Sequence, residues 1–217
     1  MEKQRKVSNP LALAVLAFLS TAPMHPYELG KRLRETDKDR SIRYNHGSLY
    51  MVIKQLAKVG FVAEQDTVRD GGRPERTVYA ITDEGRDEMR NWLRELVAEP
   101  RREYPHFGVA LSLISVLPPD EAAGLLDRRL RALASEIEEI RSAVEAAAGA
   151  GVSWVFLADD EYHLAILEAE HQFVSRLVDS LRQPDHVREW REFFEGRTWP
   201  ARPSPKAGLS FHRCTHG

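Results

Sequence analysis

The sequence is poor in the residues that several kinds of functional site require. It contains one cysteine, Cys214, among 217 residues, so no disulfide can form within the chain and a reducing cytoplasm is the expected compartment. Its apolar run from Leu11 to Leu19 is far too short to cross a bilayer. Gly71-Gly72 lacks the Lys-Ser/Thr of a phosphate-binding loop, and no Ser/His/Asp or Cys/His set can be placed. We therefore expect no membrane partner, no cofactor and no enzymatic activity.

The sequence also lacks an overall excess of positive charge, with 31 Lys/Arg against 33 Asp/Glu and a formal net charge of −2. The charge is nevertheless unevenly distributed. Residues 1–76 carry 14 Lys/Arg and 9 Asp/Glu, a net of +5, whereas the remainder carries 17 and 24, a net of −7. A polyanionic partner would therefore meet the N-terminal third of the chain.

The apolar run near the N-terminus has two interpretations. Lys3, Arg5 and Lys6 precede it and Ser20-Thr21-Ala22 follows it, which resembles a secretory signal. The alternative is a buried core helix, because Pro10 occupies the favoured first helical position and apolar residues occupy every face. We favour the helix, since nothing downstream offers a disulfide framework.

The first 98 residues have the order of elements found in a winged helix-turn-helix. Pro26 opens a second helix, and Asn45 caps a third helix that Gly60 ends. Residues 61–69 and 76–82 predict the two strands of a hairpin, and Thr82 caps a fourth helix. In a chain that is mainly α-helical, we expect residues 1–98 to form a winged helix-turn-helix DNA-binding domain with a two-stranded β wing.

Residues 99–195 predict an all-helical dimerisation domain, and residues 196–217 a disordered, proline-containing tail. Short helices are expected over residues 107–117 and 184–195, and a longer one over residues 161–181. One side of the longer helix offers Ile166, Glu170, Phe173, Leu177 and Leu181. The long helix from Pro118 carries apolar residues at alternating steps of four and three, the a/d seam of a coiled coil, which needs a partner helix. We expect a second copy of the chain to supply that partner. The candidate dimerisation residues are Leu111, Leu126, Leu130, Leu133, Ile137, Ile140 and Val144.

The third helix and the hairpin carry the candidate DNA contacts. A helix fits the major groove of B-DNA, and Asn45, His46 and Ser48 lie at its N-terminus, where orphan amides favour a phosphate. Changes at His46 or Ser48 are expected to alter sequence preference, and Tyr50 can pack against a sugar or a thymine methyl group. The basic residues suited to phosphates are Lys31, Lys54, Lys58, Arg73 and Arg76. The alternative for each lysine alone is an ordinary solvated helix face.

A set of motifs in order along the chain resembles one known family. Gly47-Ser48-Leu49-Tyr50 is followed by Gly60-Phe61-Val62, and then by the run from Gly72-Arg73-Pro74 to Thr82-Asp83-Glu84-Gly85. With the Leu11-Ala12-Leu13 start, these motifs are similar to the signature of PadR-family transcriptional regulators over residues 10–98. The sequence departs from that signature at Met51, where the family often has proline, and at Glu75-Arg76. The helical second half is similar to the C-terminal dimerisation domain of the longer PadR subfamily.

The resemblance implies a winged helix-turn-helix homodimer, usually a repressor, that binds near-palindromic double-stranded operator DNA. Two other classes remain open. A dimeric helical adaptor would use the heptad helix without binding DNA. A metal-dependent helical enzyme would use Asp160-x-x-His163 and Glu168-x-x-His171, whose spacing occurs in carboxylate metal sites, but no matching histidine lies on the heptad helix and we expect no metal. His212, Cys214 and His216 lack a fourth ligand.

Several aromatic residues fall around the expected junction of the two domains. An apolar small-molecule effector bound there would change the spacing of two recognition helices. The alternative is that these side chains are ordinary core. The candidate effector-pocket residues are Trp92, Tyr104, Phe107, Trp154 and Phe156.

Overall fold

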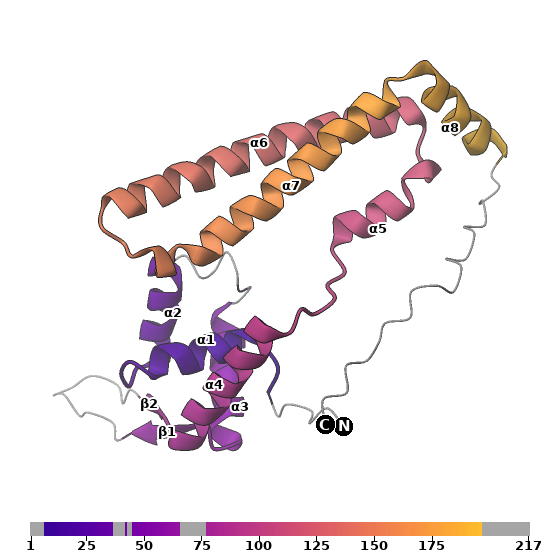
Figure 1. The fold of residues 1–217 in the computed structure, drawn as a ribbon. Coiled ribbons are helices and arrows are strands. Elements are labelled where there is room, and N and C mark those ends of the chain that lie inside the picture. Colours follow the sequence, from indigo (N-terminus) through magenta and orange to yellow (C-terminus); the bar gives the residue numbers. More distant parts are fainter. Residues whose placement is uncertain (1–6, 37–41, 43–44, 66–76, 197–217) are drawn as a thin grey trace, which may run out of the picture. The chain divides into compact units, whose positions relative to one another are not determined.

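The structure is a computed structural model that describes residues 7–36, 42, 45–65 and 77–196. The chain divides into two compact units, Met1–Glu103 and Tyr104–Gly217, and Figure 1 labels their elements. The predicted wing arginines Arg73 and Arg76 and residues 197–217 of the expected tail lie outside the described residues. Among the described residues, no helix is long and apolar enough to span a membrane.

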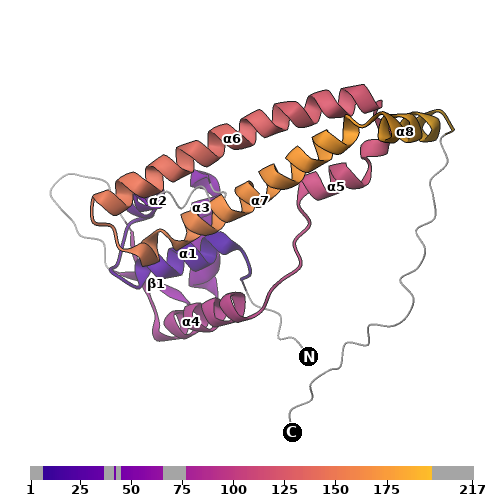
Figure 2. The same ribbon diagram turned by 45° about the horizontal axis from the view of Figure 1, so that its top comes forward.

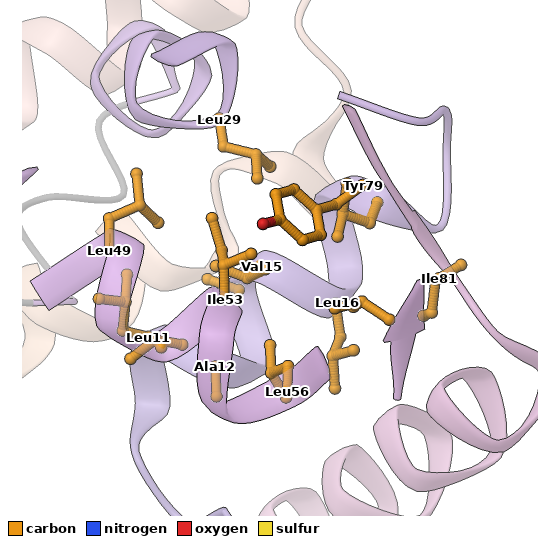
Figure 3. Packing of buried hydrophobic residues seen from close by; sticks show 14 of the residues in the cluster. Leu11, Ala12, Val15, Leu16, Leu29, Leu49, Ile53, Leu56, Tyr79 and Ile81 are labelled. Atoms are coloured by element: carbon orange, nitrogen blue, oxygen red, sulfur yellow. The ribbon is translucent and has the colours of Figure 1, made fainter. Parts of the chain in front are cut away.

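The first unit is a winged helix-turn-helix, as the sequence predicted. Its elements are α1 (Pro10–Leu19), α2 (Pro26–Glu35), α3 (His46–Lys58), β1 (Val62–Gln65), β2 (Val78–Ile81) and α4 (Asp83–Ala98). The apolar run is the buried helix α1, which packs against α3 and α4. Figure 3 shows Leu11, Val15 and Leu16 of α1 opposite Leu49, Ile53 and Leu56 of α3, which make the centre of the core.

Local capping explains where these helices begin. The Asn9 side chain accepts the Leu11 amide at 2.9 Å and Pro10 follows at the first helical position, so an otherwise orphan donor is satisfied. His25 caps α2 in the same way, its Nδ1 accepting the Tyr27 amide at 3.1 Å. Where α1 ends, Arg86 of α4 donates to the Ser20 carbonyl at 3.1 Å. The side-chain caps therefore mark where α1 and α2 begin, and the hydrogen bond from Arg86 marks where α1 ends.

The hairpin is held along the edge of β2 to the turn between α1 and α2. β1 and β2 are antiparallel, with Val62 opposite Ile81 and Glu64 opposite Tyr79. Met24, in the turn between α1 and α2, exchanges two backbone hydrogen bonds of 3.0 Å with Tyr79. β2 is shorter than the predicted strand 76–82 and β1 begins one residue after the predicted start at Phe61, while residues 66–69 of the first predicted strand lie outside the described residues. The base of the wing therefore belongs to the same rigid core as the helix-turn-helix.

The junction between α3, the hairpin and α4 is unusually tight. Gly60 ends α3 with a φ of +81°, the left-handed region that favours glycine. The Thr82 hydroxyl donates to the Gly60 carbonyl at 2.7 Å and accepts the Gly85 amide at 3.1 Å. A Cβ placed on Gly85 would lie 2.0 Å from the Phe61 carbonyl oxygen. Only glycine lets α4 start this close to the end of α3.

The second unit is all helical. Its elements are α5 (His106–Ser112), η1 (Ile114–Val116), α6 (Pro119–Gly149), η2 (Trp154–Phe156), α7 (Ala158–Leu181) and α8 (Pro184–Gly196). The short helix predicted over residues 107–117 is thus two pieces. The two long helices α6 and α7 lie side by side as a hairpin (Figures 1 and 2). Trp190 of α8 donates to the Leu117 carbonyl at 3.1 Å and fastens α8 to η1.

Our expectation that the heptad seam lacks a partner within the chain is wrong. The seam residues of α6 pack against Leu167, Val174, Val178 and Leu181 of α7 in one core cluster. The predicted face of α7 is confirmed at Leu177 and Leu181, which pack in this cluster. It is corrected at Ile166 and Phe173, which are exposed, whereas their neighbours Leu167 and Val174 are buried. The seam residues concerned are Leu126, Leu130, Leu133, Ile137, Ile140 and Val144.

We predict that Gly85→Ala destabilises the first unit by about 3 kcal/mol, since the new methyl group must displace the Phe61 backbone. Gly124→Ala is the matched control: it lies within α6 and its Cβ would meet nothing within 4 Å, so a change towards greater stability is expected there. Urea unfolding of the full chain, with hydrogen exchange to report which unit loses protection, measures both. Equal stability of Gly85→Ala and wild type would contradict the packing described for this junction.

Candidate nucleic-acid interface

The helix α3 has two opposite faces. Leu49, Val52, Ile53 and Leu56 face the core and are buried. The outward face carries exposed residues at steps of four, three and four, which place them on one stripe of a helix. They are Gly47, Met51, Lys54 and Lys58. The faces thus separate an apolar interior from a cationic surface stripe.

The N-terminal end of α3 is held by a capping box. The Ser48 amide donates to Asn45 Oδ1 and the Asn45 amide donates to Ser48 Oγ, both at 2.8 Å. The Ser48 hydroxyl also donates to the Asn45 carbonyl at 2.8 Å. These bonds engage the only proton of the Ser48 hydroxyl and give Ser48 a capping role in the free chain, while its predicted effect on base preference stays a prediction.

His46 lies where α2 and α3 cross. A Cβ on Gly30 of α2 would lie 3.4 Å from Leu49 and 3.9 Å from the His46 ring. The missing side chain of Gly30 therefore lets the N-terminal end of α3 approach α2 closely. His46 itself is exposed, and its imidazole remains at the end of the helix where a phosphate or base edge would lie.

Two tyrosines lie near the base of the wing, Tyr79 on β2 and Tyr50 on α3. The buried Tyr79 ring lies beside Leu29 and Val15 (Figure 3), and its hydroxyl donates to Glu64 Oε1 at 3.2 Å. Burial raises the pKa of Tyr79 above its ordinary value, and the hydrogen bond to Glu64 raises that pKa further. Tyr50 interacts electrostatically with the same phenol and keeps 42% of its own surface exposed.

The predicted lysines differ in how they are engaged. Lys54 and Lys58 are exposed, and no carboxylate among the described residues pairs with either. Lys31 of α2 lies 3.4 Å from Glu35 in an exposed i,i+4 pair, an interaction of only about 0.4 kcal/mol. Among the described residues, an incoming phosphate would therefore meet unpaired lysines on α3 and a weakly paired lysine on α2.

Our sequence analysis left Met51 and Tyr27 out of the candidate contacts. Both are exposed large apolar side chains, on α3 and at the start of α2. The spacing of Gly47, Met51 and Lys54 in the sequence already places Met51 on the face opposite the apolar stripe.

The candidate effector residues do not form one cluster within either unit. Trp92 belongs to the core of the first unit. In the second, Phe107 lies under the Arg129 guanidinium, 3.6 Å from its ring centroid, while Trp154 and Phe156 follow the far end of α6. The length of α6 between Arg129 and Gly149 is roughly 30 Å. Tyr104, Trp154 and Phe156 are exposed.

The histidines of α7 do not gather metal ligands. His163 lies 3.9 Å from Glu136 of α6, and Glu168 accepts a hydrogen bond from Arg141 at 2.8 Å. Within the described residues, no group of three or more His, Cys, Asp and Glu could hold a metal ion.

The fold and this surface define a winged helix-turn-helix protein with a helical second unit. Residues 15–91 match the sequence model of the "Transcriptional regulator PadR-like family". The "Negative transcriptional regulator PadR" of Bacillus subtilis is 24% identical over 179 residues, 81% of this chain and 97% of that protein. A probable transcriptional regulator of Mycobacterium tuberculosis is 34% identical over 103 residues, 46% of this chain and 50% of that protein.

Solved structures agree on the fold. The B. subtilis PadR complex with operator DNA matches with a TM-score of 0.59 and 20% identity, over 76% of this chain and 99% of that one. The PadR-like regulator BC1756 of Bacillus cereus matches with a TM-score of 0.58 and 18% identity, over 79% and 97%. The B. subtilis complex with p-coumaric acid gives 0.55 and 19%, over 76% and 98%. The first unit is thus similar in sequence to the PadR-like family of transcriptional regulators over residues 15–91, and these solved PadR structures share the fold over about three quarters of the chain.

We predict that Ser48→Ala lowers the stability of the first unit by about 1 kcal/mol, the usual cost of losing a helix cap. Ser48→Thr keeps the hydroxyl and is the control that should retain most of that stability. Affinity of Ser48→Ala for different duplexes should fall by one common factor. If Ser48→Ala kept the stability of wild type but changed the preference among duplex sequences, that result would support a base contact by Ser48 and contradict a purely capping role.

Proposed function

We propose that this chain is a DNA-binding transcriptional repressor that acts as a homodimer, in the cytoplasm that its single cysteine favours. The observation that carries the proposal is the outward stripe of α3, where Lys54 and Lys58 are exposed and, within the part of the chain that the structure describes, pair with no carboxylate, and Tyr50 is exposed on the flank of the same helix. A helix of this kind fits the major groove, where base edges are distinct. The B. subtilis relative is named a negative regulator and was solved with operator DNA, which supports the proposed repression and the proposed DNA binding.

In the proposed complex the residues have different tasks. Lys54, Lys58 and Lys31 contact phosphates, as do Arg73 and Arg76 of the wing tip. His46 and Tyr50 face base edges and sugars. Asn45 and Ser48 hold the end of the helix and point its remaining amides at the backbone.

A dimer requires a surface other than the heptad seam, because α7 covers that seam within the chain. The second unit offers exposed apolar residues on two of its elements. Val109 and Leu113 lie on or directly after α5, next to the partly buried Leu111, and Ile166 and Phe173 lie on α7. Two-fold pairing would place the two α3 helices in successive major grooves of a near-palindromic operator, about 34 Å apart.

Effector control is the second part of the proposal. The B. subtilis protein was solved with p-coumaric acid, and this chain exposes Tyr104, Trp154 and Phe156 in its second unit. An apolar molecule held by such residues would regulate the dimer by favouring one spacing of the recognition helices over another. Trp92 contributes only as core support, since it is buried.

Binding to duplex DNA in 50 mM and 200 mM salt tests the proposal. Affinity should fall steeply with salt, because each phosphate contact releases counterions. Lys54→Ala should weaken all sequences alike and reduce the slope of log K against log salt by about 1. Arg90→Ala is the control, since Arg90 is an exposed cation on α4 paired with Asp87 at 3.6 Å, and it should leave the slope unchanged.

Absence of duplex binding at low salt would overturn the proposal in favour of a helical adaptor. Binding whose affinity does not depend on salt would also contradict it. An equal loss of slope for Lys54→Ala and Arg90→Ala would show that the overall charge of the unit, and not the α3 stripe, attracts the duplex.

A further inference from the structure

Met51 stands out on the surface of the first unit. It leaves 63% of its surface exposed, although burying a methionine side chain is worth roughly 2 kcal/mol. It lies between Gly47 and Lys54 on the outward stripe of α3, one turn from each. An apolar side chain in the middle of a cationic stripe has no packing role in the described fold.

The neighbours of Met51 leave it projecting. Gly47 has no side chain, and a Cβ there would approach only Asn45 Oδ1, at 3.4 Å, so the helix surface before Met51 is bare. Lys54 and Lys58 follow it along the same stripe and are exposed. Tyr50 lies about 100° further round the helix, on the flank that interacts with Tyr79. On this stripe the thioether is the group best placed to reach the floor of a groove while the lysines contact its phosphates.

The chemistry of methionine limits what it can recognise. Its sulfur is a weak acceptor and it has no donor, so it cannot satisfy the polar edges of adenine, guanine or cytosine. Covering such an edge without a hydrogen bond is costly. The C5 methyl group of thymine is the apolar group that the major groove displays, and a flexible thioether packs well against it.

We propose that Met51 determines specificity by contacting the methyl group of one thymine in each half-site. This inference rests on the proposed DNA-binding function and adds to it a residue and a base. It assigns sequence preference to an apolar contact in the middle of α3, whereas Asn45 and Ser48 serve the helix cap.

Deoxyuridine substitution gives the sharpest test, because it removes only the methyl group of a thymine. Duplexes that the full chain selects from a random pool are resynthesised with each thymine replaced singly by deoxyuridine. Wild type should lose about fourfold in affinity at one thymine of each half-site, the effect of one methyl group buried, and little at the others. Met51→Ala should bind the thymine and deoxyuridine duplexes equally well at that position.

Two further variants keep the comparison controlled. Met51→Gln retains the length of the side chain and makes it polar, so it should also lose the discrimination, even if Met51→Ala binds too weakly to be compared. Val97→Ala removes an apolar side chain that is 86% exposed on α4 and should keep the wild-type profile. Because Met51 is exposed, both Met51 variants should unfold at the same urea concentration as wild type.

The possible results distinguish a failure of the Met51 proposal from a failure of the proposed DNA-binding function. If duplexes are selected but no deoxyuridine affects wild type, or if Met51→Ala and Met51→Gln lose as much as wild type at the same thymine, the role of Met51 is overturned and DNA binding stands. If the pool yields no bound duplex, the DNA-binding function itself is overturned, and the role of Met51 with it.

Discussion

The carbonyl group of Phe61 is the point at which three elements of the first unit are fixed to one another. Its oxygen accepts the Thr82 amide at 3.0 Å, and the Phe61 amide donates to Leu56 of α3 at 2.9 Å. Gly85 approaches the same carbonyl so closely that a methyl group would overlap it. Because the end of α3, the last residue before α4 and the base of the hairpin all meet at the backbone of this one residue, the base of the wing cannot turn relative to α3 without breaking several contacts together.

The contacts at Phe61 make the proposed DNA-binding surface of α3 rigid. The other end of α3 is held by the capping box of Asn45 and Ser48 and by the close approach of Gly30. The recognition helix is thus fixed at both ends, so its outward residues need little ordering when a duplex binds, and rigid presentation lowers the entropic cost of association. Comparable ties operate in the second unit, where Arg129 donates to Glu170 at 2.6 Å and Arg182 donates to Asp127 at 3.1 Å, joining α6 to α7.

Much of this architecture could be predicted because its signals are local. Pro10, Asn45, Gly60 and Thr82 mark ends of helices through their own backbone geometry, and all four occupy the predicted positions. The partner of the heptad seam could not be predicted in this way. A repeat of apolar residues shows that a helix must be covered, but it does not show whether α7 or a second copy covers it.

Two details of the site were also beyond the sequence. A serine three residues after an N-cap is common in helices, and only the hydrogen bonds of Ser48 show that it completes a capping box here. On α7, both residues of the adjacent pairs Ile166-Leu167 and Phe173-Val174 are apolar, so the sequence alone does not show which of two faces is buried. The side chains that meet α6 are Leu167 and Val174, and Ile166 and Phe173 remain exposed.

The central claim, that two copies of α3 lie in the major groove, is tested most directly by cleavage from the helix itself. An iron-EDTA group attached to Gln55→Cys, in a chain with Cys214→Ser, would place the cleaving centre on an exposed flank of α3. The account predicts two clusters of strand cleavage on a selected duplex, centred about 34 Å apart. A single cluster, or weak cleavage spread evenly along the duplex, would contradict it.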